Sequence, residues 1–174
     1  MSGLGGFSWF YAVLFWSMAN QTAMFFGAGS ALKVEMTNTR PRERDGREIP
    51  GTPTVTLHAT REQSNPQGTR YNWEGALSIQ VGKREITDVM AVLCHRLQNV
   101  EFRYHGLDKN KSYSLVRAGE LVELSMSTRG DKYVFKLAGA QRLELLSLCF
   151  RQWQRQQGGL SADVLFSMLE SAYK

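Results

Sequence analysis

The stretch DKYVFKLAGAQRLELLSLCFRQW, residues 131–153, changes its hydrophobic period near Gly139. Before that point Tyr133, Phe135 and Leu137 alternate with other residues, which is typical of a half-buried strand. After it, apolar residues recur at spacings of three and four, as on the core-facing side of an amphipathic helix. That stripe consists of Leu143, Leu146, Phe150 and Trp153, widened by Leu145 and Cys149. The sequence therefore predicts a strand that runs directly into a helix.

The same change of period occurs earlier in the chain. Residues 73–81 (WEGALSIQV) alternate, and residues 86–97 (ITDVMAVLCHRL) place apolar side chains on one helical face. Thr87 is expected to cap this helix, because a threonine hydroxyl can accept a hydrogen bond from a free backbone N–H at a helix start. Two strand-then-helix units predict an α+β fold with two antiparallel β-sheets, each followed by a helix.

Other stretches complete the two expected sheets. Residues 31–37 and 54–61 alternate, and residues 24–27 are a candidate fourth strand for the first sheet. Residues 38–53 are predicted to form an exposed loop, because their four arginines are largely offset by two glutamates and an aspartate. In the second half, short polar turns separate strands at residues 100–106, 112–119, 120–127 and from 133 onward. The second sheet is therefore expected to be a meander.

The N-terminal segment is unusual because residues 1–32 contain no charged side chain and residues 7–19 are almost continuously apolar. A bilayer span needs about 20 apolar residues, and polar residues 20–22 interrupt this one. The alternatives are a membrane anchor or signal, a buried or oligomer-contact element, and a translation start at Met18 or Met24. The expected divisions are an apolar segment (1–30), a main domain (31–157) and a helical tail (158–174).

The tail and the composition add three expectations. A short helix from Ser161 is predicted to carry Val164, Leu165, Met168 and Leu169 on one face. The formal net charge of +5 suits a polyanionic partner without requiring one. The two cysteines, Cys94 and Cys149, fall on apolar helix faces, where a free thiol behaves as a small hydrophobe. A reducing compartment follows, either the cytoplasm or an organelle matrix.

A helix covers only one face of a sheet, so the opposite faces are candidate binding surfaces. The expected site there combines aromatic and cationic residues, a combination that suits single-stranded nucleic acid because bases stack on rings while cations neutralise phosphates. The alternative is structural, since Tyr and Trp are good strand formers and Lys and Arg are ordinary surface residues. The candidate residues are Lys33, Tyr71, Trp73, Arg103, His105, Lys109, Lys111, Tyr113, Arg117, Lys132 and Lys136.

The order of elements from residue 31 to 153 resembles the Whirly family of single-stranded-DNA-binding proteins, relatives of the positive-cofactor coactivators and of trypanosome guide-RNA-binding proteins. Residues 30–34 (SALKV) are similar to the second half of that family's Lys-Gly-Lys-Ala-Ala-Leu-Thr-Val motif. Residues 76–93, with Glu-Phe at 101–102, resemble its strand-then-helix passage, and residues 133–153 resemble its last strand and helix. The motif's two lysines would fall at Gly27 and Gly29, so their contribution is not carried over.

The resemblance implies a homotetramer assembled through helices that binds single strands along sheet edges with little sequence preference. DNA repair, recombination, replication and transcription stay open as alternative processes for such binding. The resemblance and the aromatic–basic pattern together predict a protein that binds single-stranded DNA or RNA. The alternative is a membrane-associated or scaffold protein that uses the apolar N-terminal segment and the C-terminal helix.

No catalytic motif stands out in the sequence. His58, His95 and His105 are scattered, neither cysteine has metal-ligand spacing, and no phosphate-binding loop or nucleophile elbow is present. Glu120 and Glu123 lie three apart in an expected strand and so face opposite sides. The sequence therefore predicts no enzyme, no metal site and no cofactor.

Overall fold

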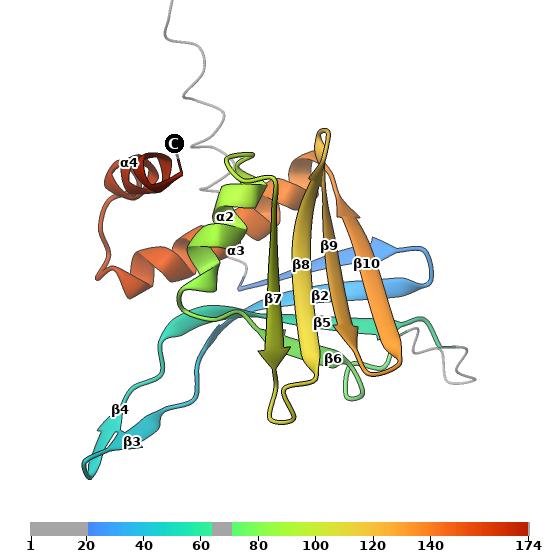
Figure 1. Cartoon of the computed structure of the whole chain (residues 1–174), viewed down its shortest axis with the longest axis horizontal. Helices are drawn as coiled ribbons and strands as arrows, with labels where there is room; N and C mark the ends of the chain where they lie inside the picture. Colours follow the sequence, from blue (N-terminus) through green and yellow to red (C-terminus); the bar gives the residue numbers. More distant parts are fainter. Residues whose placement is uncertain (1–20, 64–70, 174) are drawn as a thin grey trace, which may run out of the picture.

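The computed structural model describes residues 21–63 and 71–173, and Figure 1 shows their arrangement. The first sheet has the strand order β1-β2-β5-β6, and the second has the order β10-β9-β8-β7. All pairings are antiparallel. The strands of the second sheet run across those of the first (Figure 1). The apolar stretch 7–19, with its three open interpretations, lies outside the described residues.

The first sheet contains β1 (Thr22–Gly27), β2 (Ser30–Asn38), β5 (Pro53–Arg61) and β6 (Leu77–Gln80). The candidate strand at residues 24–27 is therefore part of β1, which begins two residues earlier. Neighbouring residues of a strand point to opposite faces of the sheet, so every second residue of a strand can face the core. The row Ala23, Val34, Leu57 and Ile79 faces the core, and so does the row Phe25, Leu32, Ala59 and Leu77.

The second sheet is the expected meander of β7 (Asn99–His105), β8 (Lys111–Ala118), β9 (Leu121–Thr128) and β10 (Asp131–Leu137). Paired residues Tyr133, Met126 and Tyr113 form one buried row, and Phe135, Leu124 and Leu115 form the next. The two inner sheet faces and the helices contribute to a single hydrophobic core. Each sheet therefore keeps one face outside this core.

The helices are α2 (Glu85–Leu93), α3 (Gly139–Gln156) and α4 (Ala162–Ala172). The expected cap at Thr87 is wrong, because α2 begins two residues before it and the Thr87 hydroxyl donates to the Arg84 carbonyl at 3.2 Å. Within the described parts of the chain, no helix is both long and apolar enough to cross a bilayer.

The apolar stripe of α3 is buried within the chain itself. Leu146, Phe150 and Trp153 are each 3–5% exposed, and the Phe150 ring stacks on Phe166 of α4 at a centroid distance of 4.8 Å. The breadth of this stripe is therefore explained by α2, α4 and the sheets. On α4 only Leu165 and Leu169 are buried, so the expected four-residue face is split between core and surface.

The region from residue 38 to 53, expected as a loop, contains a hairpin that extends the β2–β5 ribbon away from the body (Figure 1). Its strands are β3 (Arg42–Arg44) and β4 (Arg47–Ile49), and we call residues 40–51 the arm. Asp45 and Gly46 both have positive φ, 53° and 69°, as a two-residue hairpin turn of Asp-Gly type requires. The loop prediction was correct about exposure and wrong about structure.

Candidate nucleic-acid interface

Three aromatic side chains gather on the outer face of the first sheet. Phe26 projects from β1 and is 59% exposed, while Tyr71 and Trp73 follow the end of β5 in the chain. The Phe26 and Tyr71 ring centroids lie 5.7 Å apart, and those of Tyr71 and Trp73 lie 6.2 Å apart. We call these three residues the aromatic patch. Large rings at a water-exposed sheet surface are a suitable platform for unpaired bases.

A lysine adjoins the aromatic patch on the neighbouring strand. Lys33 of β2 places Nζ 5.3 Å from the Trp73 ring centroid and 2.8 Å from Glu35 Oε1. The hydrogen bond from Lys33 is the main cause that lowers the pKa of the Glu35 carboxyl below its ordinary value. The lysine is therefore held beside the ring by a carboxylate that also neutralises it.

His58 continues this polar row across the sheet. It pairs with Lys33 on one side and Ser78 on the other, and its Nδ1 lies 2.8 Å from Ser78 Oγ. Its Nε2 is 3.2 Å from Glu35 Oε2, although the angle is unsuited to a hydrogen bond. Burial lowers the pKa of the His58 imidazole, so the ring is neutral at neutral pH.

A groove of about 1000 Å³ begins where this row ends. Thr56, Ser78 and Gln80 from the outer face of the first sheet line it, together with residues of the arm and of the β7–β8 turn. Its cationic lining residues are Arg40, Arg42 and Lys83. Among the described residues that line it, none is aspartate or glutamate. The groove therefore suits a polyanion, and it adjoins the outer face of the first sheet.

The predicted residues Lys33, Tyr71 and Trp73 are thus brought together on the first sheet. Three others, His105, Lys109 and Lys111, lie on or beside the β7–β8 turn, where His105 lines the groove and Lys111 Nζ donates to the Ser78 carbonyl at 3.2 Å. Lys109 is exposed on the turn with a positive φ of 50°.

His105 lies beside a half-buried carboxylate, Glu85, which two hydrogen bonds hold in place. Its Nε2 lies 3.2 Å from Glu85 Oε1, while the Tyr113 hydroxyl donates to Glu85 Oε2 at 2.8 Å and the Gly82 amide donates to the same oxygen at 2.7 Å. Burial opposes ionisation of Glu85, but these contacts outweigh it and hold the pKa of that carboxyl below its ordinary value. The network stabilises the wall of the groove.

Arg103, Lys132 and Lys136 lie apart from the aromatic patch, on the outer face of the second sheet. Arg103 forms a two-point ion pair with Glu101, at 2.8 and 3.1 Å. Lys136 stands opposite Glu123 in the strand register. The cations of this face are therefore interleaved with carboxylates, unlike those of the groove.

The expectation that Tyr113 lies on an open face is wrong, because its strand position points inward and the residue is 2% exposed. Its hydroxyl is used by Glu85, and burial raises its pKa well above the ordinary value. Arg117 is half-buried at the sheet end, where its Nη1 donates to the His95 carbonyl at 3.5 Å. Neither residue shares a surface with the aromatic patch.

Sequence reasoning missed Phe26 and the arginines of the arm. Phe26 was overlooked because it lies in the uncharged segment of residues 1–32, which drew attention for its lack of charge. A strand at residues 22–26 would have placed Phe26 on an outer sheet face. The arm could have been found from Asp45-Gly46, the most typical dipeptide of a tight hairpin. Within the described residues, no group of three or more His, Cys, Asp or Glu side chains could hold a metal.

Comparison by sequence finds no matching family model and no matching curated protein. Solved structures do match. The plant transcriptional regulator PBF-2 aligns with a TM-score of 0.57 and 14% identity, over 79% of this chain and 82% of that one. WHY3 from Arabidopsis thaliana gives 0.55 and 12%, over 87% and 95%. MRP1/MRP2 from a trypanosome gives 0.56 and 16%, over 79% and 84%.

These structures define the class of fold. At identities of 12–16%, the likeness to these structures shows the backbone arrangement alone. In this chain that arrangement is two four-stranded antiparallel sheets with their helices. The chain has a Whirly-like α+β fold, and the prediction of that architecture is confirmed.

Proposed function

We propose that the chain is a non-enzymatic protein that binds single-stranded DNA or RNA on the outer face of its first sheet. The observation that carries this proposal is the aromatic patch beside Lys33, in which the Tyr71 ring centroid lies 5.7 Å from that of Phe26 and 6.2 Å from that of Trp73. The Whirly-like fold supports it, since one solved structure of this fold is a plant transcriptional regulator.

The chemistry of the patch sets the expected preference. Rings contact the faces of bases, which all bases possess, so binding has little sequence preference. In a duplex the base faces are already stacked and are not available to Phe26 or Trp73. Single strands therefore bind more tightly than duplexes of the same sequence.

Binding to oligo-dT and to a duplex of equal length, followed by fluorescence anisotropy across a range of salt, tests this function. The proposal requires tighter binding of the single strand and a log–log salt slope of about −0.7 per phosphate neutralised. Equal affinity for the duplex, or no binding at low salt, would remove it.

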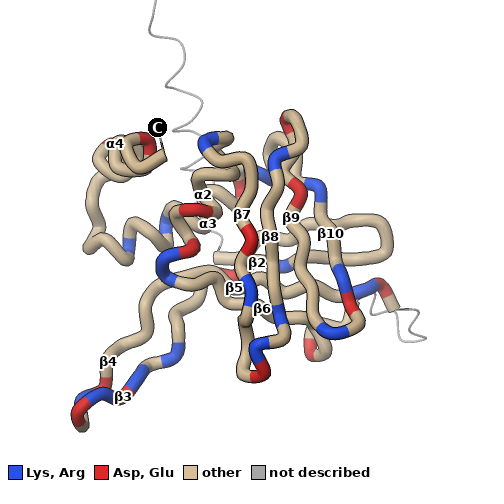
Figure 2. The backbone as a smooth tube through the Cα atoms, in the orientation of Figure 1, with Lys and Arg blue, Asp and Glu red and all other residues tan. Residues whose placement is uncertain are grey.

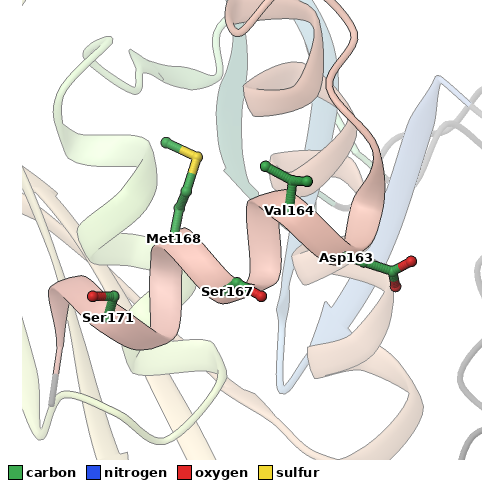
Figure 3. Close-up of a pocket in the computed structure, with 5 residues that line it drawn as sticks. All are labelled: Asp163, Val164, Ser167, Met168 and Ser171. Atoms are coloured by element: carbon green, nitrogen blue, oxygen red, sulfur yellow. The ribbon is translucent and has the colours of Figure 1, made fainter.

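The homo-oligomer implied by the family resemblance is also a proposal, and we place its contact on the outward face of α4. The α3 stripe is already buried, whereas Val164 and Met168 are 47% and 43% exposed. Figure 3 shows these two side chains on one side of α4, lining a shallow hollow of about 430 Å³. A second copy of α4 would cover this apolar surface.

The thiols support the proposed reducing compartment. Cys94 and Cys149 are both free, and burial raises their pKa values to about 11 and about 12. Both are therefore protonated and chemically quiet, as structural cysteines are.

A further inference from the structure

The arm sorts its charges by face, which the net charge of the segment conceals. In its register Arg44 pairs with Arg47, Glu43 with Glu48 and Arg42 with Ile49. Directly paired residues share a face, and successive pairs alternate between faces. The arm therefore has an arginine face, formed by Arg42, Arg44, Arg47 and Ile49, and an acidic face formed by Glu43 and Glu48.

This arrangement is unfavourable for the isolated arm. Like charges directly opposite each other destabilise a strand pair, and the arm has one such pair on each face. Arg44 has Asp45 within 3.7 Å, but both side chains are at least 80% exposed, where an ion pair contributes little. A bound polyanion would relieve the repulsion on the arginine face. The charge pattern is thus suited to a ligand rather than to the stability of the hairpin.

The arginine face opens onto the groove. Arg42 and Ile49 of that face line it, as does Arg40 at the base of the arm, and Lys83 lines it from the loop before α2. Figure 2 shows the basic positions along the arm, which projects from the body near β6. Phosphates in this groove would therefore meet cations from the arm and from Lys83.

The groove continues from the aromatic patch without a break in the sheet. Lys33, His58 and Ser78 are paired across β2, β5 and β6, so they form one row on the outer face. Adjacent strands lie about 4.8 Å apart, so Lys33 and Ser78 are about 10 Å from each other along this row. Lys33 adjoins Trp73, and Ser78 lines the groove.

We propose that the arm is a phosphate clamp for single-stranded nucleic acid. A strand stacked on the aromatic patch crosses the sheet along the Lys33–Ser78 row and enters the groove, where Arg40, Arg42 and Lys83 neutralise its phosphates. This inference rests on the proposed function and extends its site to a segment with no base-stacking residue.

The test compares a long and a short ligand on the full chain. The double variant Arg42→Gln/Lys83→Gln is measured with oligo-dT of about 25 nucleotides and of about 4 nucleotides. The short ligand matches the lower end of the site sizes of single-strand-binding OB folds, about 4–16 nucleotides, and the long ligand exceeds the upper end. With the long ligand its salt slope becomes shallower by about 1.4, twice the value for one phosphate. With the short ligand, which fills only the patch, affinity and slope match wild type.

A matched control removes the same kind of charge elsewhere. Arg129 is exposed in the β9–β10 turn, and Arg129→Gln should leave both slopes unchanged. An unchanged long-ligand slope in the double variant, or a slope that becomes shallower by about 0.7, one phosphate's worth, in Arg129→Gln, overturns the clamp while the proposed function stands. Absence of binding by wild type to either ligand at low salt removes the proposed function and the clamp with it.

Discussion

The ammonium nitrogen of Lys33 lies 5.3 Å from the ring centroid of Trp73, so a cation and an aromatic platform from separate parts of the chain share one place on the first sheet. A base stacked on the ring would have its phosphate within reach of the lysine. Glu35, only 2.8 Å from the same nitrogen, competes for that charge.

Removing this competitor should improve binding. Glu35→Gln frees the Lys33 charge for a phosphate, so affinity for oligo-dT rises and the salt slope steepens by about 0.7, one phosphate's worth. The control is Glu101→Gln, which removes a carboxylate at the same 2.8 Å distance from a cation on the second sheet and should leave binding unchanged. Anisotropy titrations showing weaker or unaltered binding by Glu35→Gln would exclude a phosphate contact at Lys33.

Tyr113 is expected to act on stability alone. Tyr113→Phe leaves the ring in the core but removes the hydroxyl that donates to Glu85, and a hydrogen bond to a charged group contributes about 1.5–3 kcal/mol. Urea denaturation should show a loss of about that size, while the folded variant binds oligo-dT as wild type does. Normal stability with impaired binding would place Tyr113 in the site after all.

The same network predicts a pH dependence. The pKa of Glu85 is lowered in the folded chain from an ordinary 4.5. Below pH 4.5 the unfolded state therefore binds more protons than the folded state, and the free energy of unfolding decreases as the pH is lowered. This contribution is complete above pH 4.5 and is lost as the pH falls through the folded pKa. Glu85→Gln should be less stable at neutral pH, and its free energy of unfolding should depend less on pH below 4.5. An identical acid limb in the two proteins would contradict this.

Assembly through α4 is testable by light scattering. Val164→Asp/Met168→Asp introduces charge on the proposed contact and should lower the molar mass of the particle, with the fold retained because both residues are exposed. Val134→Asp is the control, since Val134 is 38% exposed on the second sheet. A monomeric wild-type protein at micromolar concentration, or dissociation by the control as well, would rule out this contact.

Much of the fold was predictable because the hydrophobic period changes sharply at two points. Near Gly139 and again near Glu85, a period of two gives way to three and four, and each change fixes a strand-to-helix junction. The prediction that Thr87 caps a helix was wrong for a local reason. The helix starts earlier, where the Glu85 carboxylate accepts a hydrogen bond from the Gly82 amide.

The site was predictable only in part, since alternation along a strand does not reveal which face is inside. Tyr113 and Trp73 have the same aromatic character in the sequence, yet one occupies a buried row and the other lies over Lys33. Phe26 contacts Tyr71, which lies 45 positions later in the chain. No local sequence pattern predicts a contact over that separation. The arm has nearly balanced charges in the sequence. Only the strand register shows that its arginines and its glutamates lie on opposite faces.

The aromatic patch itself is tested most directly by comparing Trp73→Ala and Phe26→Ala with Tyr104→Ala. Tyr104 is 73% exposed on β7 and does not line the groove. Each patch variant should remain folded by thermal melting and lose about 1–3 kcal/mol of affinity for oligo-dT at every salt concentration, with the salt slope unchanged, because stacking releases no counterion. Tyr104→Ala should bind as wild type does. Folded Trp73→Ala and Phe26→Ala proteins that both retain wild-type affinity would contradict the placement of the site on the first sheet.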